Sequence, residues 1–155
     1  MKKEALKRIF EFLEEKGEQR IPFLWKWKNE IPLTEEDLNV QGDLDFSQSE
    51  IESLPEGLKI SGDLDLSYTY IRLLPKGLKV GGNLNLLDTP ITFLPKGLEV
   101  GGYLDIRYTK ITSLPKGLEV GANLYIKNTA LVEYTDEELK EMVKPGTLAR
   151  RIYRE

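Results

Sequence analysis

The chain has 155 residues, of which 40% are hydrophobic and 31% charged. This composition is typical of one soluble globular domain and unlike that of a disordered or membrane protein. There is no cysteine and no histidine, which excludes disulfides, thiolate metal sites and cysteine nucleophiles and removes the commonest general base. The net charge is -4, and residues 38–134 are its acidic part, with 9 basic and 12 acidic residues. We therefore expect no direct nucleic-acid binding, which needs a basic face.

The first residues carry charges where a signal peptide needs an unbroken apolar segment, and no later run is long enough to span a membrane. The lack of cysteine agrees with a reducing compartment. We expect a cytoplasmic protein that does not associate with membranes.

Residues 1–37 are predicted to form an N-terminal cap. An amphipathic helix is expected over residues 2–16, because its apolar residues recur at helical spacing, and Gly17 follows as a C-cap. These apolar residues are Leu6, Ile9, Phe10 and Leu13. Residues 21–27 hold both tryptophans of the chain. We expect this segment to shield the open edge of the repeats that follow, and the alternative is an aromatic ligand site.

Residues 38–134 repeat with a period of twenty. The repeats are 38–57, 58–77, 78–97, 98–117 and 118–137, with the frame L-x-[VI]-x-G-x-L-x-[LIF]-x-x-T-x-I-x-x-L-P-x-G. Apolar residues alternate at 58/60 and at 64/66, which is the period of a half-buried strand. Because twenty residues cannot hold a strand, a crossover helix and two turns, we expect two short strands per coil and a stack of parallel strands.

Two glycine columns punctuate each repeat. Gly57, Gly77, Gly97 and Gly117 follow proline by two residues, where a turn needs positive φ, and Gly42, Gly62, Gly82 and Gly102 mark the corner between strands. The pairs Gly81-Gly82 and Gly101-Gly102 lack the Lys-Ser/Thr of a phosphate-binding loop. We interpret these glycines as structural.

On its four L-P-x-G-L units, this frame resembles the short, twenty-residue bacterial type of leucine-rich repeat. The resemblance implies a mostly β fold, a right-handed parallel β-solenoid of five coils with helical caps at both ends. Where that family carries Asn after the strand, this chain has Thr69, Thr89, Thr109 and Thr129. We expect these to form an internal ladder of hydroxyls bonded along the stack. Threonine-rich variants look like proteins of phages and other mobile elements.

Residues 135–155 are predicted to form a C-terminal helical cap. Thr135 and Glu138 have the spacing of a capping box, and Leu139, Met142 and Val143 form the apolar stripe of the helix that follows. A shorter segment after Pro145 carries Leu148, Ile152 and Tyr153.

The outward positions of the second strand of each repeat are the candidate partner-binding residues. These are Asp43, Asp45, Asp63, Asp65, Asn83, Asn85, Tyr103, Asp105, Arg107, Tyr125 and Lys127. The row changes from acidic to tyrosine and basic, and we expect a protein partner across it. Because these positions have no core duty, we expect Asp63 and Asp65 to meet basic groups of the partner and Tyr103 and Tyr125 to supply buried anchors. Two alternatives stay open: polar residues that only prevent aggregation, and a calcium site at the four aspartates.

A second group of apolar side chains is not required by the repeat frame. It comprises Tyr68, Tyr70, Leu73, Phe93 and Tyr108. Leu73 and Phe93 occupy the same position in successive repeats, so we expect them to touch and to form an exposed apolar strip. The alternative is that a cap folds over them.

No catalytic residues, metal ligands or cofactors are expected, because histidine and a G-x-S-x-G motif are absent and paired carboxylates lie on an open sheet. We predict a non-enzymatic protein–protein interaction module, monomeric or weakly dimeric, such as a phage protein that binds and inhibits a host protein. The alternatives are an acidic decoy that mimics nucleic acid, a structural scaffold and, least favoured, a hydrolase.

Overall fold

The computed structural model describes Glu4 and residues 23–155 of the chain. The helix expected over residues 2–16 and its C-cap at Gly17 lie outside the described residues. Contacts divide the chain into two units, Met1–Val40 and Gln41–Glu155, and each is described by itself. None of the helices in the described ranges is long and apolar enough to cross a membrane.

In the first unit, part of the predicted aromatic segment is helical. Helix α2 (Phe23–Lys28) stacks Phe23 on Trp27, with ring centroids 6.0 Å apart, and strand β1 (Asn39–Val40) ends the unit. The buried Lys26 ammonium lies 3.1 Å from Asp37 Oδ2. Burial raises the pKa of Asp37, but hydrogen bonds from the Thr34 amide and from Lys26 outweigh it and hold that pKa below its usual value.

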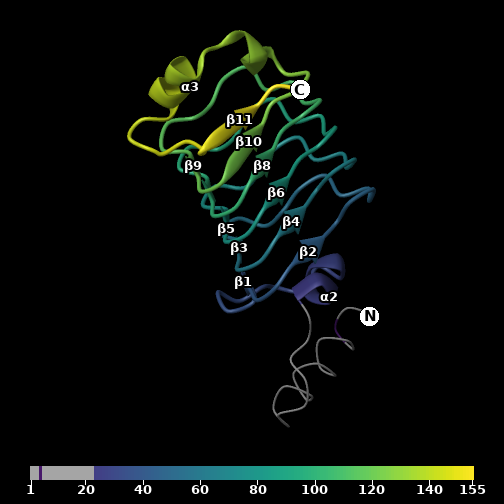
Figure 1. Ribbon diagram of the computed structural model, residues 1–155. Coiled ribbons are helices and arrows are strands. Elements are labelled where there is room, and N and C mark those ends of the chain that lie inside the picture. Colours follow the sequence, from purple (N-terminus) through teal and green to yellow (C-terminus); the bar gives the residue numbers. More distant parts are fainter. Residues whose placement is uncertain (1–3, 5–22) are drawn as a thin grey trace. The chain divides into compact units, whose positions relative to one another are not determined.

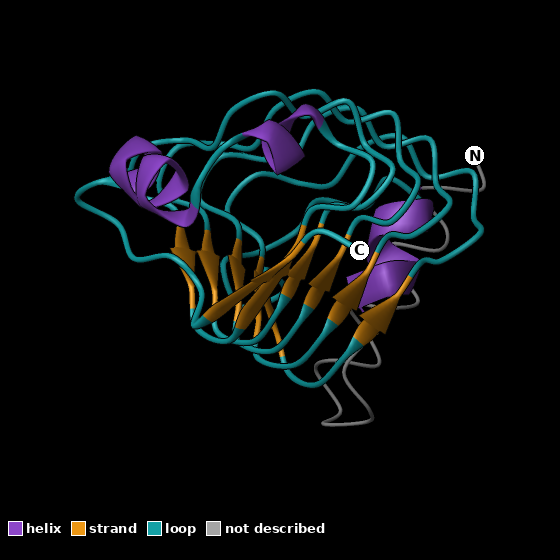
Figure 2. Ribbon diagram, turned by 45° about the horizontal axis from the view of Figure 1, so that its top comes forward, coloured by secondary structure: helices purple, strands orange, loops and turns teal. Residues whose placement is uncertain are grey.

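The second unit is built of short parallel strands in two sheets (Figure 1). In the first sheet, strands β3 (Lys59–Ile60), β5 (Lys79–Val80), β7 (Glu99–Val100) and β9 (Glu119–Val120) lie in this order. In the second sheet the order is β2 (Leu44–Asp45), β4 (Leu64–Asp65), β6 (Leu84–Asn85), β8 (Leu104–Asp105), β10 (Asn123–Tyr125) and β11 (Arg151–Tyr153). Figure 2 shows the strands on one side of this unit and the loops of each turn on the opposite side.

The register of the strands confirms the twenty-residue repeat. Leu64 pairs with Leu84, Leu84 with Leu104, and Leu104 with Leu124, always in parallel. In the first sheet Val80 pairs with Val100 in the same way. The unit is therefore a parallel β-solenoid of about four turns, as the alternation of apolar residues predicts.

Columns of aliphatic side chains form the core of the solenoid. The frame leucines, the strand residues after them and the isoleucine of the return loop are buried, and the most deeply buried, at most 1% exposed, include Leu58, Leu78, Leu98, Leu66, Leu86, Ile71, Ile91 and Ile111. Full burial of such a side chain contributes about 1.5–3 kcal/mol. The predicted apolar positions are confirmed here, because equivalent side chains stack on one another from turn to turn.

The two glycine columns have different physical causes. The glycines after proline have positive φ as predicted, for example 74° at Gly77 and 70° at Gly97. At the corner, Gly82 is needed for close approach instead, because a Cβ there would lie 2.1 Å from Asp63 Oδ1 and 2.8 Å from a backbone carbon of Gly62. Steric contact between turns therefore favours glycine at Gly62, Gly82 and Gly102, whereas Gly42 has open space and a φ of 89°.

The threonine column lies inside the protein, but its predicted hydrogen bonding along the stack is wrong. Thr69, Thr89, Thr109 and Thr129 are 3–6% exposed. Each hydroxyl donates to the carbonyl three residues earlier in its own turn, as Thr69 Oγ1 does to Leu66 O at 2.7 Å and Thr89 Oγ1 to Leu86 O at 2.9 Å. The nearby carbonyl satisfies the buried hydroxyl locally, so no donor is left for the next turn.

The C-terminal segment does more than form a helix. The 3-10 helix η1 (Ala130–Glu133) precedes α3 (Asp136–Val143), whose capping box is confirmed, with the Thr135 amide 2.8 Å from Glu138 Oε2. After α3 the chain adds β11 beside β10, and Thr147 forms a bridge with Glu119 of β9. The tail thereby covers the last edge of both sheets, which would otherwise expose unpaired backbone groups.

Candidate partner-binding surfaces

We name the outward side of the second sheet the strand face. Its inner residues, such as Leu64 and Leu84, are buried, so the residues on either side of them in the strand point outward. All eleven candidate residues lie on this side, and register pairs Asp45 with Asp65 and Asn85 with Asp105. Asp43 and Asp45 are exposed, whereas Asp105 is only 4% exposed. The candidates therefore share one face but differ in accessibility.

One column of the strand face connects consecutive turns by hydrogen bonds. Asp43 Oδ1 accepts from the amide of Asp63 at 2.8 Å, Asp63 Oδ1 from that of Asn83 at 2.7 Å, and Asn83 Oδ1 from that of Tyr103 at 2.9 Å. These side chains lie outside the core, yet they have a structural role that their individual sequence positions do not indicate. The signal in the sequence is the recurrence of Asp or Asn before the strand leucine, since these side chains readily accept from backbone amides.

A second column forms local turns at the ends of the strands. Asp45 and Asp65 each accept from the amide two residues on, both at 2.8 Å, and Asn85 does so at 3.1 Å. Hydrogen bonds from the Ser47 hydroxyl and amide hold the pKa of Asp45 below its usual value. The side-chain Nδ2 of Asn85 also donates to Asp65 Oδ2 at 3.1 Å. Donors on the same turn and on the next turn thus satisfy these side-chain oxygens.

The four aspartates do not form a metal site in this arrangement. Across Glu4 and residues 23–155, no three acidic side chains come together in a way that could hold a metal ion. Oδ1 oxygens of Asp43, Asp63, Asp45 and Asp65 instead accept hydrogen bonds from backbone amides. The arrangement therefore gives no support to the calcium alternative.

Three tyrosines lie close together at the C-terminal end of the strand face, on strands β8, β10 and β11 and the residues beside them. The rings of Tyr103 and Tyr125 meet edge to face, with centroids 5.7 Å apart, and those of Tyr125 and Tyr153 stack at 4.8 Å with 11° between their planes. Tyr153 comes from β11 and pairs with Tyr125. The sequence does not indicate Tyr153 as a site residue, because it lies outside the repeats and nothing in the repeat pattern shows where the tail pairs.

Arg107 and Asp105 form an ion pair beside these rings. Arg107 Nε lies 2.9 Å from Asp105 Oδ1 and Nη2 lies 2.6 Å from Oδ2, while the guanidinium is 5.5 Å from the centre of the Tyr125 ring. The hydrogen bond to Asp105 raises the pKa of Arg107. Burial, and then the charges of Asp63, Asp105 and Asp65, raise the pKa of Tyr103. Because Asp105 neutralises Arg107, the change to a basic end is weaker than the sequence predicts.

The predicted apolar strip lies on a different side, among the return loops. Its five members, Tyr68, Tyr70, Leu73, Phe93 and Tyr108, are 47–61% exposed. Tyr68 and Tyr108 have positive φ, at 56° and 59°. Leu73 and Phe93 line one hollow of about 800 Å³, whose other lining residues are Ser53, Leu54, Glu56, Leu74, Pro75, Lys76, Leu94, Pro95, Lys96 and Pro115. The structure thus places the two predicted neighbours against the same concave surface.

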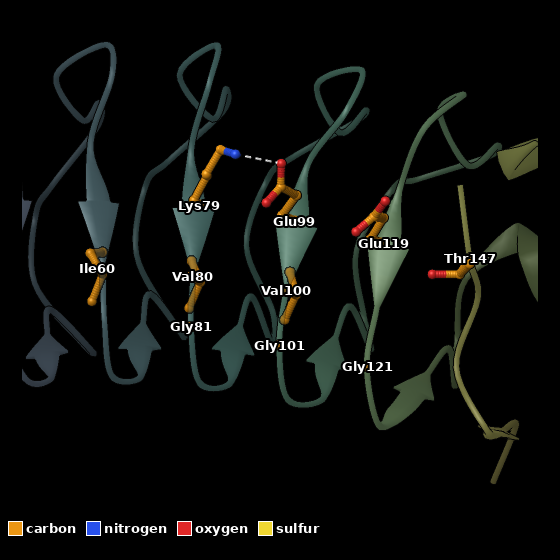
Figure 3. Close-up of a pocket in the computed structure, with 10 residues that line it drawn as sticks. All are labelled: Ile60, Lys79, Val80, Gly81, Glu99, Val100, Gly101, Glu119, Gly121 and Thr147. Carbon is orange, nitrogen blue, oxygen red and sulfur yellow. Dashed lines mark ion pairs between the residues drawn. The ribbon is translucent and has the colours of Figure 1, made fainter. Parts of the chain in front are cut away.

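A smaller hollow, of about 360 Å³, lies along the first sheet (Figure 3). Gly81, Gly101 and Gly121 form part of its lining, and Lys79 Nζ is paired with Glu99 Oε1 at 2.6 Å. The sequence does not predict this hollow. Its glycines recur every twenty residues as the repeat requires, and this spacing does not show whether they also line a surface. Lys79 is already paired with Glu99, and the carboxylate of Glu119 lines the hollow as well, so the charged groups of this lining are acidic on balance.

The geometry thus provides two surfaces with different chemistry. The strand face carries hydrogen-bonded carboxylates and a tyrosine cluster, whereas the return loops carry exposed apolar side chains around a hollow. No protein-family model, curated protein or solved structure matches this chain.

Proposed function

We propose that the protein is a non-enzymatic interaction module that binds a protein partner across its strand face. The observation that carries this proposal is the cluster of Tyr103, Tyr125 and Tyr153 on adjacent strands, next to Arg107. Tyrosine and arginine are the residues most often responsible for binding energy at protein interfaces. Tyr103 and Tyr125 are partly buried and Tyr153 is 36% exposed, so the rings pack on one another yet stay accessible.

The orientation of the rings favours a protein over a ligand that stacks on aromatic faces. The stacked rings of Tyr125 and Tyr153 each cover one face of the other, and the Arg107 guanidinium lies over the Tyr125 ring, so the cluster offers a partner few open ring faces. Bases of single-stranded nucleic acid bind on exposed ring faces. An interface with aromatic anchors and a polar rim, here supplied by Asn85 and Lys127, is typical of protein partners.

The proposal includes the finer architecture that the sequence implies. We propose a right-handed solenoid of leucine-rich-repeat type with five coils, α2 in a cap at one end and α3 in a cap at the other. The L-x-L strands and the twenty-residue register support this. We further propose that the protein is cytoplasmic, monomeric or weakly dimeric, and acts by binding and inhibiting a host protein, as the resemblance to phage-type repeats implies.

The test is capture of partners from bacterial lysate on the immobilised full chain, followed by affinity measurements with the purified partner. Tyr125→Ala is expected to weaken binding by about 2 kcal/mol, roughly thirtyfold in Kd. Tyr134→Ala is the matched control, because Tyr134 is 37% exposed but lies outside the strand face. Circular dichroism would verify that each variant retains its fold.

Two results would contradict the proposal. If Tyr125→Ala and Tyr153→Ala both bind the partner as the unaltered protein does, the strand face is not the site. If every captured protein is a basic DNA-binding protein that increasing salt releases steeply, the acidic decoy becomes the better account.

A further inference from the structure

The return loops of three successive repeats form an unusually basic surface, which we name the loop face and define as residues 70–76, 90–96 and 110–116. It contains five cations and no acidic residue, although the whole chain has a net charge of -4. The cations are Arg72, Lys76, Lys96, Lys110 and Lys116, and all are exposed. None of them forms an ion pair with a residue that the structure describes.

The hollow of about 800 Å³ lies mainly in this basic surface and extends onto Ser53, Leu54 and Glu56 of the preceding repeat, so its lining holds two lysines and one carboxylate. Leu73 and Phe93, which are 54% and 53% exposed, line it together with prolines of the L-P-x-G turns, and Lys76 and Lys96 line it as well. A hollow of this size falls within the range of about 300–1,000 Å³ that ligand sites occupy. It therefore combines apolar contact area with adjacent positive charge.

The fold does not require the two exposed apolar side chains of this hollow, Leu73 and Phe93. The positions equivalent to Leu73 and Phe93 are Ser53 and Ser113 in the flanking repeats. The core beneath is supplied by other residues, since Leu74 and Leu94 are 4–6% exposed. Exposed apolar side chains at positions where the same fold accepts serine indicate a role in binding.

We propose that this hollow binds an amphipathic helix of a partner protein, with its apolar edge on Leu73 and Phe93 and acidic side chains against Lys76, Lys96 and Lys116. The lining residues run from Ser53 to Pro115, which is three repeat spacings. At about 4.8 Å per spacing this is about 14 Å, the length of roughly ten helical residues.

The secondary structure of the loop face favours a helix over an extended peptide. Residues 70–76 and 90–96 contain no strand, so a partner finds no sheet edge for main-chain pairing there. Recognition must use side chains, as it does when an apolar helix edge lies in a groove. The charge of the surface selects acidic flanks on that helix.

The shape of the surface distinguishes this partner from an anionic membrane. A lipid surface is bound by apolar side chains that protrude into it. Here Leu73 and Phe93 line a concave hollow with the lysines around them, which fits a convex occupant such as a row of side chains on a helix.

The experiment is selection from a displayed library of helical peptides of about 15 residues, four helical turns, on the immobilised full chain. Binders that also bind the Phe93→Ser variant are removed. We expect the remaining sequences to have apolar residues at i, i+3 or i+4, and i+7, flanked by Asp and Glu. A selection that returns no sequence dependent on Phe93, or only basic ones, overturns the proposal.

The affinities of selected peptides are then measured by fluorescence anisotropy against two variants taken from the chain's own repeats. Phe93→Ser introduces the residue found at 53 and 113, and Lys96→Glu that found at 56, so both should fold. We expect each to weaken binding at least about tenfold, and the loss from Lys96→Glu to shrink as salt rises. Equal affinity for the Phe93→Ser variant would contradict the proposal.

Two further measurements separate this site from the strand face and from a membrane-binding surface. Tyr125→Ala, on the strand face, should leave peptide affinity unchanged, so failure of one proposed site is distinguishable from failure of the other. Sedimentation with phosphatidylserine vesicles tests the membrane alternative. If the unaltered protein pellets with these vesicles and the Phe93→Ser variant does not, a membrane rather than a helix occupies the loop face.

Discussion

The strand face and the loop face of the same repeats use their polar side chains in opposite ways. On the strand face, Asp43, Asp63 and Asn83 accept hydrogen bonds from the next turn. On the loop face, the cations are exposed and form no ion pair with any described residue. The strands are mostly two residues long, so side chains on the strand face add bonds between turns that longer strands would make with backbone alone. Charge that is not needed for folding is found on the loops.

The largest expected effect is on the strand face. Asp63→Ala removes the acceptor of the Asn83 amide at 2.7 Å and of the Asn83 side chain at 3.2 Å. We expect the free energy of unfolding to fall by about 1 kcal/mol, because the bond is solvent-accessible but charge-assisted. Urea denaturation measures this difference.

Two further variants test whether the two faces differ. Asp63→Asn should be destabilised much less than Asp63→Ala, since the asparagine side chain of Asn83 accepts the equivalent hydrogen bond from the Tyr103 amide. Lys96→Ala, on the loop face, should change the free energy of unfolding by less than about 0.5 kcal/mol. If Lys96→Ala is as destabilising as Asp63→Ala, the contrast between the faces is wrong.

A smaller change in stability is expected from a substitution at Tyr108, which lies just after strand β8 and before the loop face. Tyr108 has φ of 59°, a conformation that Asn128 and Asp88 adopt at equivalent positions. Asn tolerates this left-handed region better than Tyr, so Tyr108→Asn should raise the free energy of unfolding by up to about 1 kcal/mol. Thermal denaturation is the measurement.

Tyr70→Asn provides the comparison, because Tyr70 is 61% exposed but is not among the residues with positive φ. It should give no gain in stability. Destabilisation by Tyr108→Asn would show that the Tyr108 ring contributes more packing energy than its 47% exposure indicates.

The smallest effect is confined to alkaline solution. Burial, followed by the charges of Asp63, Asp105 and Asp65, raises the pKa of Tyr103 above its ordinary value of 10.0. The folded protein favours the protonated ring, so this contribution is fully present below about pH 10 and is lost as pH rises through the raised pKa. Urea denaturation of the unaltered protein and Tyr103→Phe, compared between about pH 8 and 11, measures it. An identical decline with pH in both would contradict the prediction.

The sequence by itself determined the solenoid and its core. A twenty-residue period with alternating leucines leaves only one way to bury every apolar column, so the stacking of Leu64, Leu84, Leu104 and Leu124 could be predicted. The positive φ of the glycines after proline and the capping box at Thr135 follow equally from local chemistry. These features depend on residues close together in the chain or on a regular repeat.

Only the tertiary structure decided which polar side chains are structural and which remain available to a partner. An aspartate before a strand looks the same in sequence whether it faces solvent or accepts from an amide twenty residues later, as Asp63 does. The pairing of Tyr153 with Tyr125 likewise depends on where the chain returns after α3. Such contacts join segments distant in the chain, and their geometry is set by the stacking of turns, which no local pattern encodes.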